Sequence, residues 1–363
     1  MKCACLVLTK DSECLRGLAS GVVATCENAG YEFAEIRLLR RFDEAAIVAT
    51  VQGYKQAFDD VFVFVDGYSL TLVAQTVGLA FGRAFTQTSA EGAGIFSDEG
   101  KTLFLMPRGD EAYVTEICLP YLAKKYSIRI GCLVFRCVGV DERRMQTLLA
   151  QAETMASGRV RFRLEGCFGE QILRIFYDEQ TPRMLTDDLV RFFAQELDDN
   201  LYALEDTPLE KLLVELLRLR RKRIALAESF TGGGIAKKIV SVSGASEVYY
   251  EGINAYSGLS KIARLGVSEF TLRSQGAVSE QTAYEMAAGL LQQGNCDVAV
   301  ATTGLSGPTS DESGQPVGTC YIAVGIDGDV YVYRYVLQGD REEISETAIR
   351  YALFLACKQL KNR

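Results

Sequence analysis

The sequence predicts an α/β protein built in three parts along its 363 residues. Two observations support this fold class. Short apolar runs typical of buried strands alternate with apolar residues at helical spacing, first over residues 1–130 and again over residues 205–363. Alternation of this kind favours mostly parallel sheets with helices on both faces. Between them, residues 131–204 have the order of strands and helices of a small α+β domain.

Within the two larger parts, continuous apolar runs predict strands, and apolar residues at helical spacing predict helices. The predicted strands are 3–8, 33–38, 61–65, 102–106, 224–227, 248–256, 297–302, 320–325 and 330–336. The predicted helices are 15–29, 43–58, 70–81, 209–221, 232–240, 279–292 and 342–360. Ser279 is the expected N-cap of its helix, and Asp327-Gly328 is the expected turn of the last hairpin.

The middle part follows a β-α-β-β-α order. Its predicted elements are the strand 132–138, the helix 141–155, a hairpin of 159–165 with 171–177, and the helix 183–197. The polar segment 205–208 contains a proline and is a plausible boundary to the C-terminal part. We therefore expect domains at 1–130, 131–204 and 205–363.

Composition and charge narrow the classes of function. A net charge of −8 argues against a nucleic-acid surface. No apolar run approaches the roughly 20 residues that span a bilayer. Charges at Lys10, Asp11 and Glu13 come too early for a signal peptide. The sequence thus predicts a cytoplasmic protein with no membrane partner.

The eleven cysteines indicate free thiols in a reducing compartment. Their number is odd and no CxxC occurs, so neither a zinc site nor a redox motif is expected. The closest pair, Cys3 and Cys5, is expected to point to opposite faces of a strand. The chain has no histidine, which excludes Ser-His-Asp and Cys-His catalysis. Any nucleophile must therefore be activated by a lysine, a tyrosine or a carboxylate.

The segment 224–234 carries the clearest chemistry. A short apolar strand leads to a Glu-Ser pair and then to a glycine-rich turn at the start of a helix. Amides at a helix N-terminus can bind an anion or a developing oxyanion, so those of Thr231, Gly232 and Gly233 are candidates for that role. Ser229 is either the helix N-cap, which the local sequence favours, or a nucleophile.

Two further loops, 256–261 and 303–308, and the short segment 339–341 also have unusual composition. In an open α/β sheet, ligands bind where loops leave the carboxyl ends of strands. Because each of the two loops follows a predicted strand, we expect them to converge with Ser229 on one crevice.

Each residue in these loops has a functional and a structural interpretation. Lys261 is either part of a functional site or a solvated surface residue, and Tyr256 is either part of that site or a sheet-edge aromatic. Arg341 either grips a phosphate bidentately or forms an ordinary surface ion pair with a neighbouring carboxylate. The remaining candidates either bind phosphate or ribose or only form a turn: Thr303, Gly304 and Gly307.

Short motifs follow one another through the C-terminal part in an order known from one family. They are Ala227-Glu228-Ser229-Phe230-Thr231-Gly232-Gly233, Gly244-Ala245-Ser246, Tyr256-Ser257-Gly258 with Lys261, Leu265-Gly266-Val267, Gly276-Ala277-Val278-Ser279, Pro316-Val317-Gly318 and Gly339-Asp340-Arg341. On these motifs, which cover nearly all of residues 208–360, the chain resembles the CinA (competence/damage-inducible) family. Its C-terminal part resembles nicotinamide mononucleotide deamidase. The resemblance favours Ser229 as a nucleophile over Ser229 as an N-cap.

The resemblance implies a C-terminal α/β/α domain that hydrolyses the carboxamide of nicotinamide mononucleotide to nicotinate mononucleotide and ammonia, without a cofactor, in a homodimer. It makes Ser229 the nucleophile and Lys261 and Tyr256 its activating partners. Residue chemistry supports the lysine independently, because a lysine of lowered pKa is the credible base for a serine where histidine is missing.

Several positions depart from the family pattern. They are Phe230 for cysteine, Gly258 for asparagine, Thr309-Ser310 for Gly-Gly and Gln315 for lysine. None removes a catalytic group, so they bear on substrate choice more than on the class of reaction. Two alternatives stay open: a non-catalytic nucleotide-binding or assembly protein, and residual ADP-ribose pyrophosphatase activity in the N-terminal domain.

The N-terminal half resembles the same family more weakly, through segments 103–111 and 135–142. This resemblance implies a three-layer, molybdopterin-binding-like domain, which the family associates with ADP-ribose pyrophosphatase activity. The family's glycine-rich turn with paired aspartates is replaced here by Val65-Asp66-Gly67-Tyr68-Ser69. We interpret Asp66 as a turn residue, which argues against a divalent metal there. We expect this domain to have lost catalysis and to serve assembly.

Overall fold

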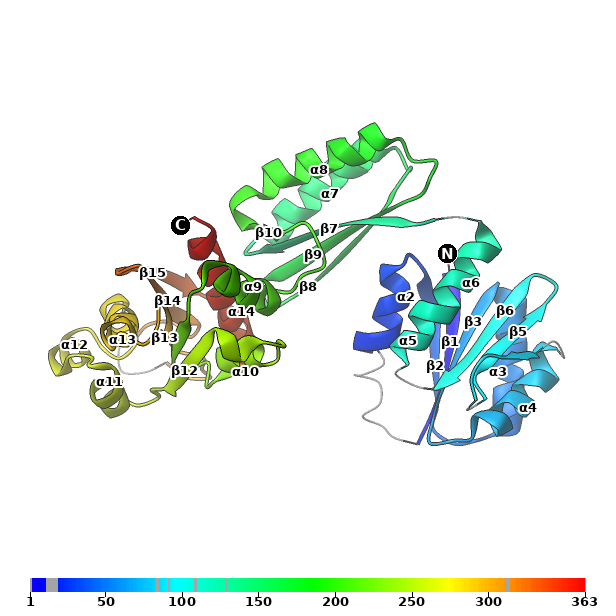
Figure 1. The fold of residues 1–363 in the computed structure, drawn as a ribbon, viewed down its shortest axis with the longest axis horizontal. Helices are drawn as coiled ribbons and strands as arrows, with labels where there is room; N and C mark the ends of the chain where they lie inside the picture. The colour runs from blue at the N-terminus through cyan, green and yellow to red at the C-terminus, as the bar shows by residue number, and fades with distance from the viewer. Residues whose placement is uncertain are drawn as a thin grey trace. The chain divides into compact units, whose positions relative to one another are not determined.

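Three separate sheets organise the chain (Figure 1). The computed structural model describes residues 2–10, 19–82, 85–90, 92–107, 110–127, 129–310 and 314–362. These residues group into two compact units. One contains Met1–Cys132 with the short stretches Arg159–Arg161 and Phe176–Pro182, and the other contains Leu133–Gly158, Phe162–Ile175 and Arg183–Arg363. This grouping joins most of the middle part to the C-terminal part, and the predicted three-domain boundaries stay predictions.

The N-terminal sheet has six strands in the order β2-β1-β3-β6-β5-β4. Its strands are β1 (Lys2–Thr9), β2 (Glu32–Leu39), β3 (Asp60–Asp66), β4 (Phe85–Gln87), β5 (Gly94–Asp98) and β6 (Lys101–Pro107). Pairing is parallel from β2 through β6 and antiparallel beyond it. The four parallel strands were predicted, whereas the short antiparallel edge of β4 and β5 was missed.

Helices cover both faces of this sheet. They are η1 (Ala19–Val23), α2 (Ala24–Asn28), α3 (Glu44–Ala57), α4 (Leu70–Phe81), α5 (Glu111–Tyr113), η2 (Val114–Cys118) and α6 (Leu119–Tyr126). Buried residues of α3 and α4 pack on one face, and those of α2, η2 and α6 pack on the other. The expected three layers are therefore confirmed. The helical run 111–126 was missed, and the first residues of the predicted helix 15–29 lie outside the described residues.

The expectation that Cys3 and Cys5 face opposite ways was wrong. Both side chains lie in the same buried cluster, together with Val7, whereas Ala4 and Leu6 lie in the cluster on the other face. The physical reason is that side chains alternate with every residue along a strand, so residues two apart share a face.

The middle sheet has four strands in the order β10-β7-β9-β8. Its elements are β7 (Gly131–Val138), α7 (Glu142–Ala156), β8 (Arg161–Cys167), β9 (Glu170–Tyr177), α8 (Arg183–Leu197), η3 (Asp198–Asn200) and β10 (Leu201–Ala203). Within the second unit, the Glu170 carboxylate lies 3.1 Å from Arg136 of β7 and 3.4 Å from Arg350 of the last helix. This partly buried carboxylate ties the middle sheet to the C-terminal part.

The C-terminal sheet has five strands in the order β12-β11-β13-β14-β15. The strands are β11 (Ile224–Glu228), β12 (Tyr249–Asn254), β13 (Val298–Gly304), β14 (Thr319–Ile326) and β15 (Asp329–Val336). The helices are α9 (Leu209–Arg220), α10 (Gly234–Val240), η4 (Ala245–Glu247), α11 (Gly258–Leu265), α12 (Glu269–Ser274), α13 (Glu280–Gln292) and α14 (Arg341–Lys361). The helices α11 and α12 were missed, since the motif beginning at Tyr256 was interpreted as a loop.

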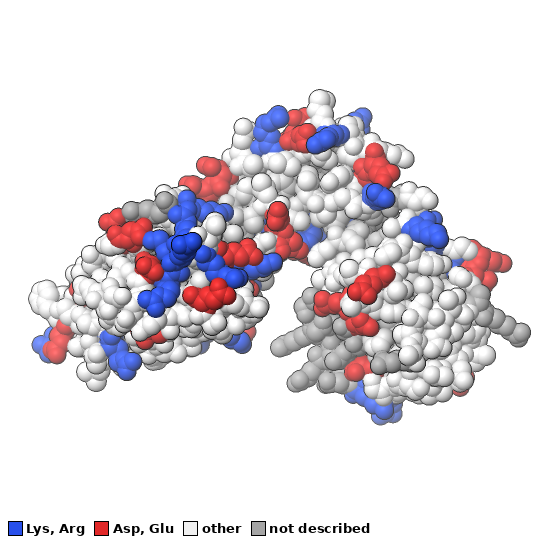
Figure 2. All heavy atoms as spheres, viewed as in Figure 1, with Lys and Arg blue, Asp and Glu red and all other residues white. Residues whose placement is uncertain are grey.

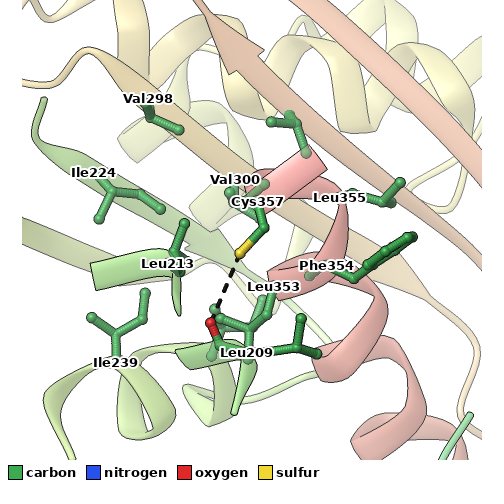
Figure 3. Packing of buried hydrophobic residues seen from close by; sticks show 14 of the residues in the cluster. Leu209, Leu213, Ile224, Ile239, Val298, Val300, Leu353, Phe354, Leu355 and Cys357 are labelled. Carbon is green, nitrogen blue, oxygen red and sulfur yellow. Dashed lines mark hydrogen bonds between the residues drawn. The ribbon is translucent and has the colours of Figure 1, made fainter. Parts of the chain in front are cut away.

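The two faces of this sheet carry different side chains. The face under α9, α10 and α14 is built from bulky aliphatic residues such as Ile224, Leu226 and Val300 (Figure 3). The opposite face, under α13, is built largely from alanines: Ala225, Ala227, Ala299, Ala301 and Ala323. Alanines let a helix backbone approach a sheet closely. Together the two cores give the predicted α/β/α order of layers.

Charged side chains of both signs are mixed over the face of the molecule in Figure 2. Near the end of α9, for example, Arg218 pairs with Glu247 and Lys222 pairs with Asp327. Within the described residues, no helix combines the length and the apolar composition needed to cross a bilayer.

α13 lies close to the end of α11. Replacing glycine by alanine should therefore change stability in opposite directions at two helical glycines, one in this contact and one outside it. A Cβ on Gly289 would lie 1.9 Å from the Leu265 carbonyl oxygen, whereas a Cβ on Gly53 of α3 would meet nothing within 4 Å. We expect Gly289→Ala to destabilise its unit by about 1–3 kcal/mol, the usual range for overpacking. Gly53→Ala should stabilise its unit by about 0.5–1 kcal/mol, because alanine is the better helix former. Urea unfolding of the two variants measures both effects, and a Gly289→Ala protein as stable as the wild type would contradict the packing.

Candidate active site

The candidate site lies where three parallel strands end. β11 is flanked by β12 and β13, and Glu228 at its carboxyl end is aligned with Asn254 and Thr302 of these neighbours. The chain leaves β11 toward β12 on one side and later returns as β13 on the other. This reversal of direction is where open α/β sheets place ligand crevices. The predicted convergence of the Ser229, Tyr256 and Thr303 segments on one edge is therefore confirmed.

Ser229 lies in the tight turn directly after β11. Its N–H donates to the Thr302 carbonyl at 3.1 Å, and its residue is only 7% exposed. Ser229 is not the cap of the following helix. The N-cap position of α10 is Gly233, whose φ of 96° suits glycine. The N-cap interpretation of Ser229 is therefore wrong, and its hydroxyl is free for another role.

The helix amides are capped instead by Glu228. Its buried carboxylate accepts hydrogen bonds from the N–H groups of Gly233 and Ile235, both at 3.1 Å, and of Ala236 at 2.9 Å. A carboxylate that accepts amides at the positive end of a helix is a favourable arrangement. It also occupies the place where an external anion would otherwise bind.

The proposed oxyanion donors must be revised in consequence. The Gly232 N–H donates to the Ser229 carbonyl at 3.1 Å, and the Gly233 N–H donates to Glu228. Neither glycine therefore has a free amide in this structure. The Thr231 N–H has no acceptor among the described residues, and its side-chain hydroxyl lies 2.8 Å from that of Thr302.

Lys261 meets Ser229 from the neighbouring helix α11. Its Nζ lies 2.8 Å from the Ser229 Oγ and 2.8 Å from the Ala255 carbonyl oxygen. Ser257 caps α11 at its start, and helical side chains tilt toward the N-terminus, so the lysine reaches back over the first turn. The surface interpretation of Lys261 is wrong, because the residue is only 1% exposed.

The lysine amine is buried without a counter-ion. Among the residues that the structure describes, no carboxylate lies within ion-pair distance of its Nζ. Burial disfavours the charged form and lowers the pKa of Lys261 from 10.5 to about 8. A substantial fraction of the amine is therefore neutral near physiological pH. The neutral amine has a lone pair that can accept the Ser229 proton.

Tyr256 lines the same pocket. Within the described residues, it forms no hydrogen bond with Ser229 or Lys261. Its hydroxyl accepts from Nη2 of Arg341 at 3.2 Å, and Nη1 of Arg341 donates to the Gly307 carbonyl at 2.7 Å. Arg341 forms no ion pair within the described part of the chain, which disfavours the surface ion-pair interpretation. Asp340 instead caps α14 in a reciprocal box with Glu343.

The Thr303 loop closes another wall. The Thr303 hydroxyl donates to the Ala277 carbonyl at 2.6 Å and so joins β13 to the segment before α13. Gly304 has to be a glycine, because a Cβ there would lie 2.6 Å from Cβ of Cys320 and 2.9 Å from the ring of Phe230. Gly307 has a φ of 78°, which is also in the range that favours glycine.

These side chains enclose a pocket of about 230 Å³. Its lining residues are Ser229, Phe230, Tyr256, Lys261, Ala277, Val278, Thr303, Gly304, Leu305, Ser306, Gly307, Thr309 and Arg341. Seven of the predicted site residues are thus brought together, while Thr231, Gly232 and Gly233 do not line the pocket. The other lining residues were not predicted as site residues: Phe230, Ala277, Val278, Leu305, Ser306 and Thr309. The motif that contains Ala277 and Val278 was recognised, but its place beside the serine depends on tertiary structure.

The described part of the pocket lining favours an anionic ligand. Among the residues that the structure describes there, two are basic, Lys261 and Arg341, and none is an aspartate or glutamate. The combination fits a ligand with an anionic end near Arg341 and an electrophilic group near Ser229. A buried serine with a lysine of lowered pKa is an arrangement for nucleophilic catalysis.

In the N-terminal unit, the predicted turn residue Asp66 is found at the end of β3. Its carboxylate accepts a hydrogen bond from the Thr9 hydroxyl at 2.9 Å, and Ser69 caps the following helix α4. Among the described residues, no group of three or more potential ligands of the types His, Cys, Asp and Glu is arranged to hold a metal.

Comparison with known proteins identifies relatives that match most of the chain. The family model of the CinA C-terminal domain matches residues 206–360. A CinA-like protein of Kosmotoga olearia is 33% identical over 269 residues, which is 71% of this chain and 64% of that protein. The chain thus spans less than two thirds of the length of this relative. A protein of Thermoanaerobacter sp. (strain X514), named as competence-damage inducible, is 30% identical over 333 residues, 90% of this chain and 76% of its own length.

Among solved structures, a CinA superfamily protein of Escherichia coli is 33% identical and covers 45% of this chain and 95% of its own chain, with a TM-score of 0.41. The similarity to the Thermoanaerobacter protein extends over nine tenths of the sequence. The chain therefore belongs to the CinA, or competence/damage-inducible, protein family.

Proposed function

We propose that the C-terminal domain hydrolyses the carboxamide of nicotinamide mononucleotide to nicotinate mononucleotide and ammonia. One observation carries the proposal: a buried lysine amine without a counter-ion lies 2.8 Å from a serine hydroxyl at the carboxyl end of the sheet. The choice of substrate follows from the resemblance of the site motifs to the nucleotide deamidase, and the two basic residues in the described part of the pocket lining support it.

The first half of the reaction forms an acyl-enzyme. The neutral Lys261 amine accepts the proton of the Ser229 hydroxyl while the oxygen attacks the carboxamide carbon. Negative charge moves to the carbonyl oxygen of the tetrahedral intermediate, where amide N–H groups of the turn stabilise it. The Lys261 ammonium then gives its proton to the leaving nitrogen, the C–N bond breaks, and ammonia departs.

The second half releases the acid. A water molecule takes the place of ammonia, and the neutral Lys261 amine accepts one of its protons as the oxygen attacks the ester carbon. Collapse of the second tetrahedral intermediate breaks the bond to the Ser229 oxygen, which takes the proton back from Lys261. The acid product loses its remaining proton to the solvent and leaves as the carboxylate, and the serine–lysine pair returns to its starting state.

The charges of the pocket orient the nucleotide. The Glu228 carboxylate occupies the helix N-terminus, so the phosphate does not bind there. Arg341 is the remaining basic residue of the lining besides Lys261. We therefore place the phosphate at Arg341 and the carboxamide at Ser229, with the Tyr256 hydroxyl and the Gly307 carbonyl holding the guanidinium in position.

Removing the nucleophile should stop the reaction. In Ser229→Ala, we expect ammonia release from nicotinamide mononucleotide to fall to background, because the acyl-enzyme cannot form. Ser241→Ala, at the exposed end of α10, is the matched control and should keep wild-type turnover. Unchanged ammonia release in Ser229→Ala, with folding confirmed by circular dichroism, would rule out the mechanism.

The dependence of kcat/KM on pH should reflect the protonation state of Lys261. Only the neutral amine acts as a base, so kcat/KM should rise as pH increases through about 8, the pKa of Lys261. Lys261→Arg should lose activity, because the guanidinium stays charged at all accessible pH values. Tyr256→Phe should keep the wild-type midpoint, since the tyrosine hydroxyl bonds to Arg341. A midpoint displaced by Tyr256→Phe would instead make the tyrosine the titrating partner.

The phosphate assignment can be tested with a truncated substrate. We expect Arg341→Met to raise KM for nicotinamide mononucleotide by about tenfold or more, in line with the loss of a charge-assisted hydrogen bond. Its kcat/KM for nicotinamide riboside, which has no phosphate, should equal that of the wild type. Arg334→Met, an exposed arginine of β15, is the control. Equal losses on both substrates would place the phosphate elsewhere.

A further inference from the structure

Glu228 has an unusual position for a carboxylate. It is the last residue of the buried strand β11, directly before Ser229, and it is only 1% exposed. Its side chain crosses the turn to the start of α10, where it accepts the Gly233, Ile235 and Ala236 amides. A helix is usually capped by the residue that directly precedes its first turn. Here the capping carboxylate comes from the last residue of the strand. Ser229 therefore lies in the turn between Glu228 and the helix amides that the Glu228 side chain accepts.

The hydrogen bonds to the Glu228 carboxylate leave few N–H groups of the turn without an acceptor. The amides of Ser229, Gly232 and Gly234 donate to backbone carbonyls. Those of Gly233, Ile235 and Ala236 donate to the Glu228 carboxylate. From Ser229 to Ala236, only two N–H groups have no acceptor within the described part of the chain: those of Phe230 and Thr231.

These two amides flank the nucleophile on its C-terminal side. Phe230 lines the pocket together with Ser229 and Lys261. In serine enzymes with a strand–turn–helix nucleophile, the N–H of the residue after the serine is a usual oxyanion donor. A buried amide that lacks an internal acceptor carries a free-energy cost, which an oxyanion would relieve.

We propose that Glu228 is a positioning residue for the reaction: its carboxylate holds the turn so that the Phe230 amide, supported by the Thr231 amide, faces the developing oxyanion beside Ser229. The inference rests on the proposed function and deepens it by assigning the oxyanion site and the group that shapes it. Glu228 touches neither the substrate nor the reacting atoms.

The carboxylate does not act as a second base. Its two oxygens already accept three amides, and the group next to the Ser229 hydroxyl is Lys261. Burial lowers the pKa of Lys261, and the hydrogen bonds of its amine go to Ser229 and Ala255 rather than to Glu228. Removing the Glu228 charge should therefore weaken stabilisation of the oxyanion and leave the titration of the base unchanged.

The test compares Glu228→Gln with the wild type by two readouts. A glutamine keeps the shape but places an NH₂ group against amide donors, so it cannot accept all three. The first readout is kcat and KM for nicotinamide mononucleotide. The second is the rate at which a fluorophosphonate phosphonylates Ser229, in which a phosphorus–oxygen bond forms and fluoride leaves. Asp141→Asn is the matched control, because Asp141 also caps a helix by accepting two amides, at the start of α7.

We expect Glu228→Gln to lower kcat and the phosphonylation rate by at least about tenfold, since loss of one oxyanion donor typically costs about 10²–10³ in kcat. KM should stay within about twofold and the pH midpoint near that of Lys261 should not move. Asp141→Asn should leave all of these values unchanged. Rates are expressed per folded molecule, measured by circular dichroism.

Two results would overturn the inference. One is a Glu228→Gln protein with wild-type kcat and labelling rate per folded molecule, which would make the carboxylate only a stabilising cap. The other is a displaced pH midpoint, which would make Glu228 part of the proton path. Labelling does not depend on the substrate, so wild-type protein that labels at Ser229 but releases no ammonia would refute the proposed function while the Glu228 comparison still decides this proposal.

Discussion

The C-terminal domain is organised around the buried amine of Lys261, whose charged form is more stable in water than in the protein interior. Moving the pKa of Lys261 from 10.5 to about 8 corresponds to about 3 kcal/mol of destabilisation at neutral pH. Between these two pH values the unfolded chain binds more protons than the folded one, so stability rises with pH there. The two apolar cores on either side of the sheet supply the stability that tolerates this group. A salt bridge at the same place would relieve the strain and remove the base.

The domain holds the backbone in place on both sides of the contact between Ser229 and Lys261. Ser229 is held between the Thr302 carbonyl and the Glu228 link, and Lys261 is held by a capped helix and the Ala255 carbonyl. Arg341, at the first turn of α14, closes the opposite side of the pocket through Gly307 and Tyr256. Each reacting or binding group thus depends on a strand end or a helix start, and side chains anchored to strands and helices are positioned more precisely than those on loops.

The sequence predicted those parts that follow from local periodicity. The parallel strands, the helix 70–81, the N-cap Ser279 and the Asp327-Gly328 hairpin all follow from patterns within a few residues. Lys261 was assigned through the resemblance of its motif to the CinA family, and the absence of histidine supported a lysine as the base. The acceptor of the α10 amides could not be found in this way. Glu228 lies in a strand, and nothing local shows that its side chain turns toward the next helix. The short edge strands β4 and β10 were missed for a similar reason, because three residues give no period.

The alanine face of the C-terminal sheet has a consequence for how this protein can change over generations. On the aliphatic face, isoleucine, leucine and valine can replace one another with small adjustments, so drift there should be gradual. On the alanine face, any larger side chain pushes α13 outward, and with it the contact between Gly289 and the end of α11. Because α11 carries Lys261, a substitution on the alanine face can displace Lys261 through the contact between α13 and α11. The position that Lys261 must keep therefore limits which substitutions this side of the sheet tolerates. Libraries that randomise both faces equally should therefore recover active clones almost entirely from one of them.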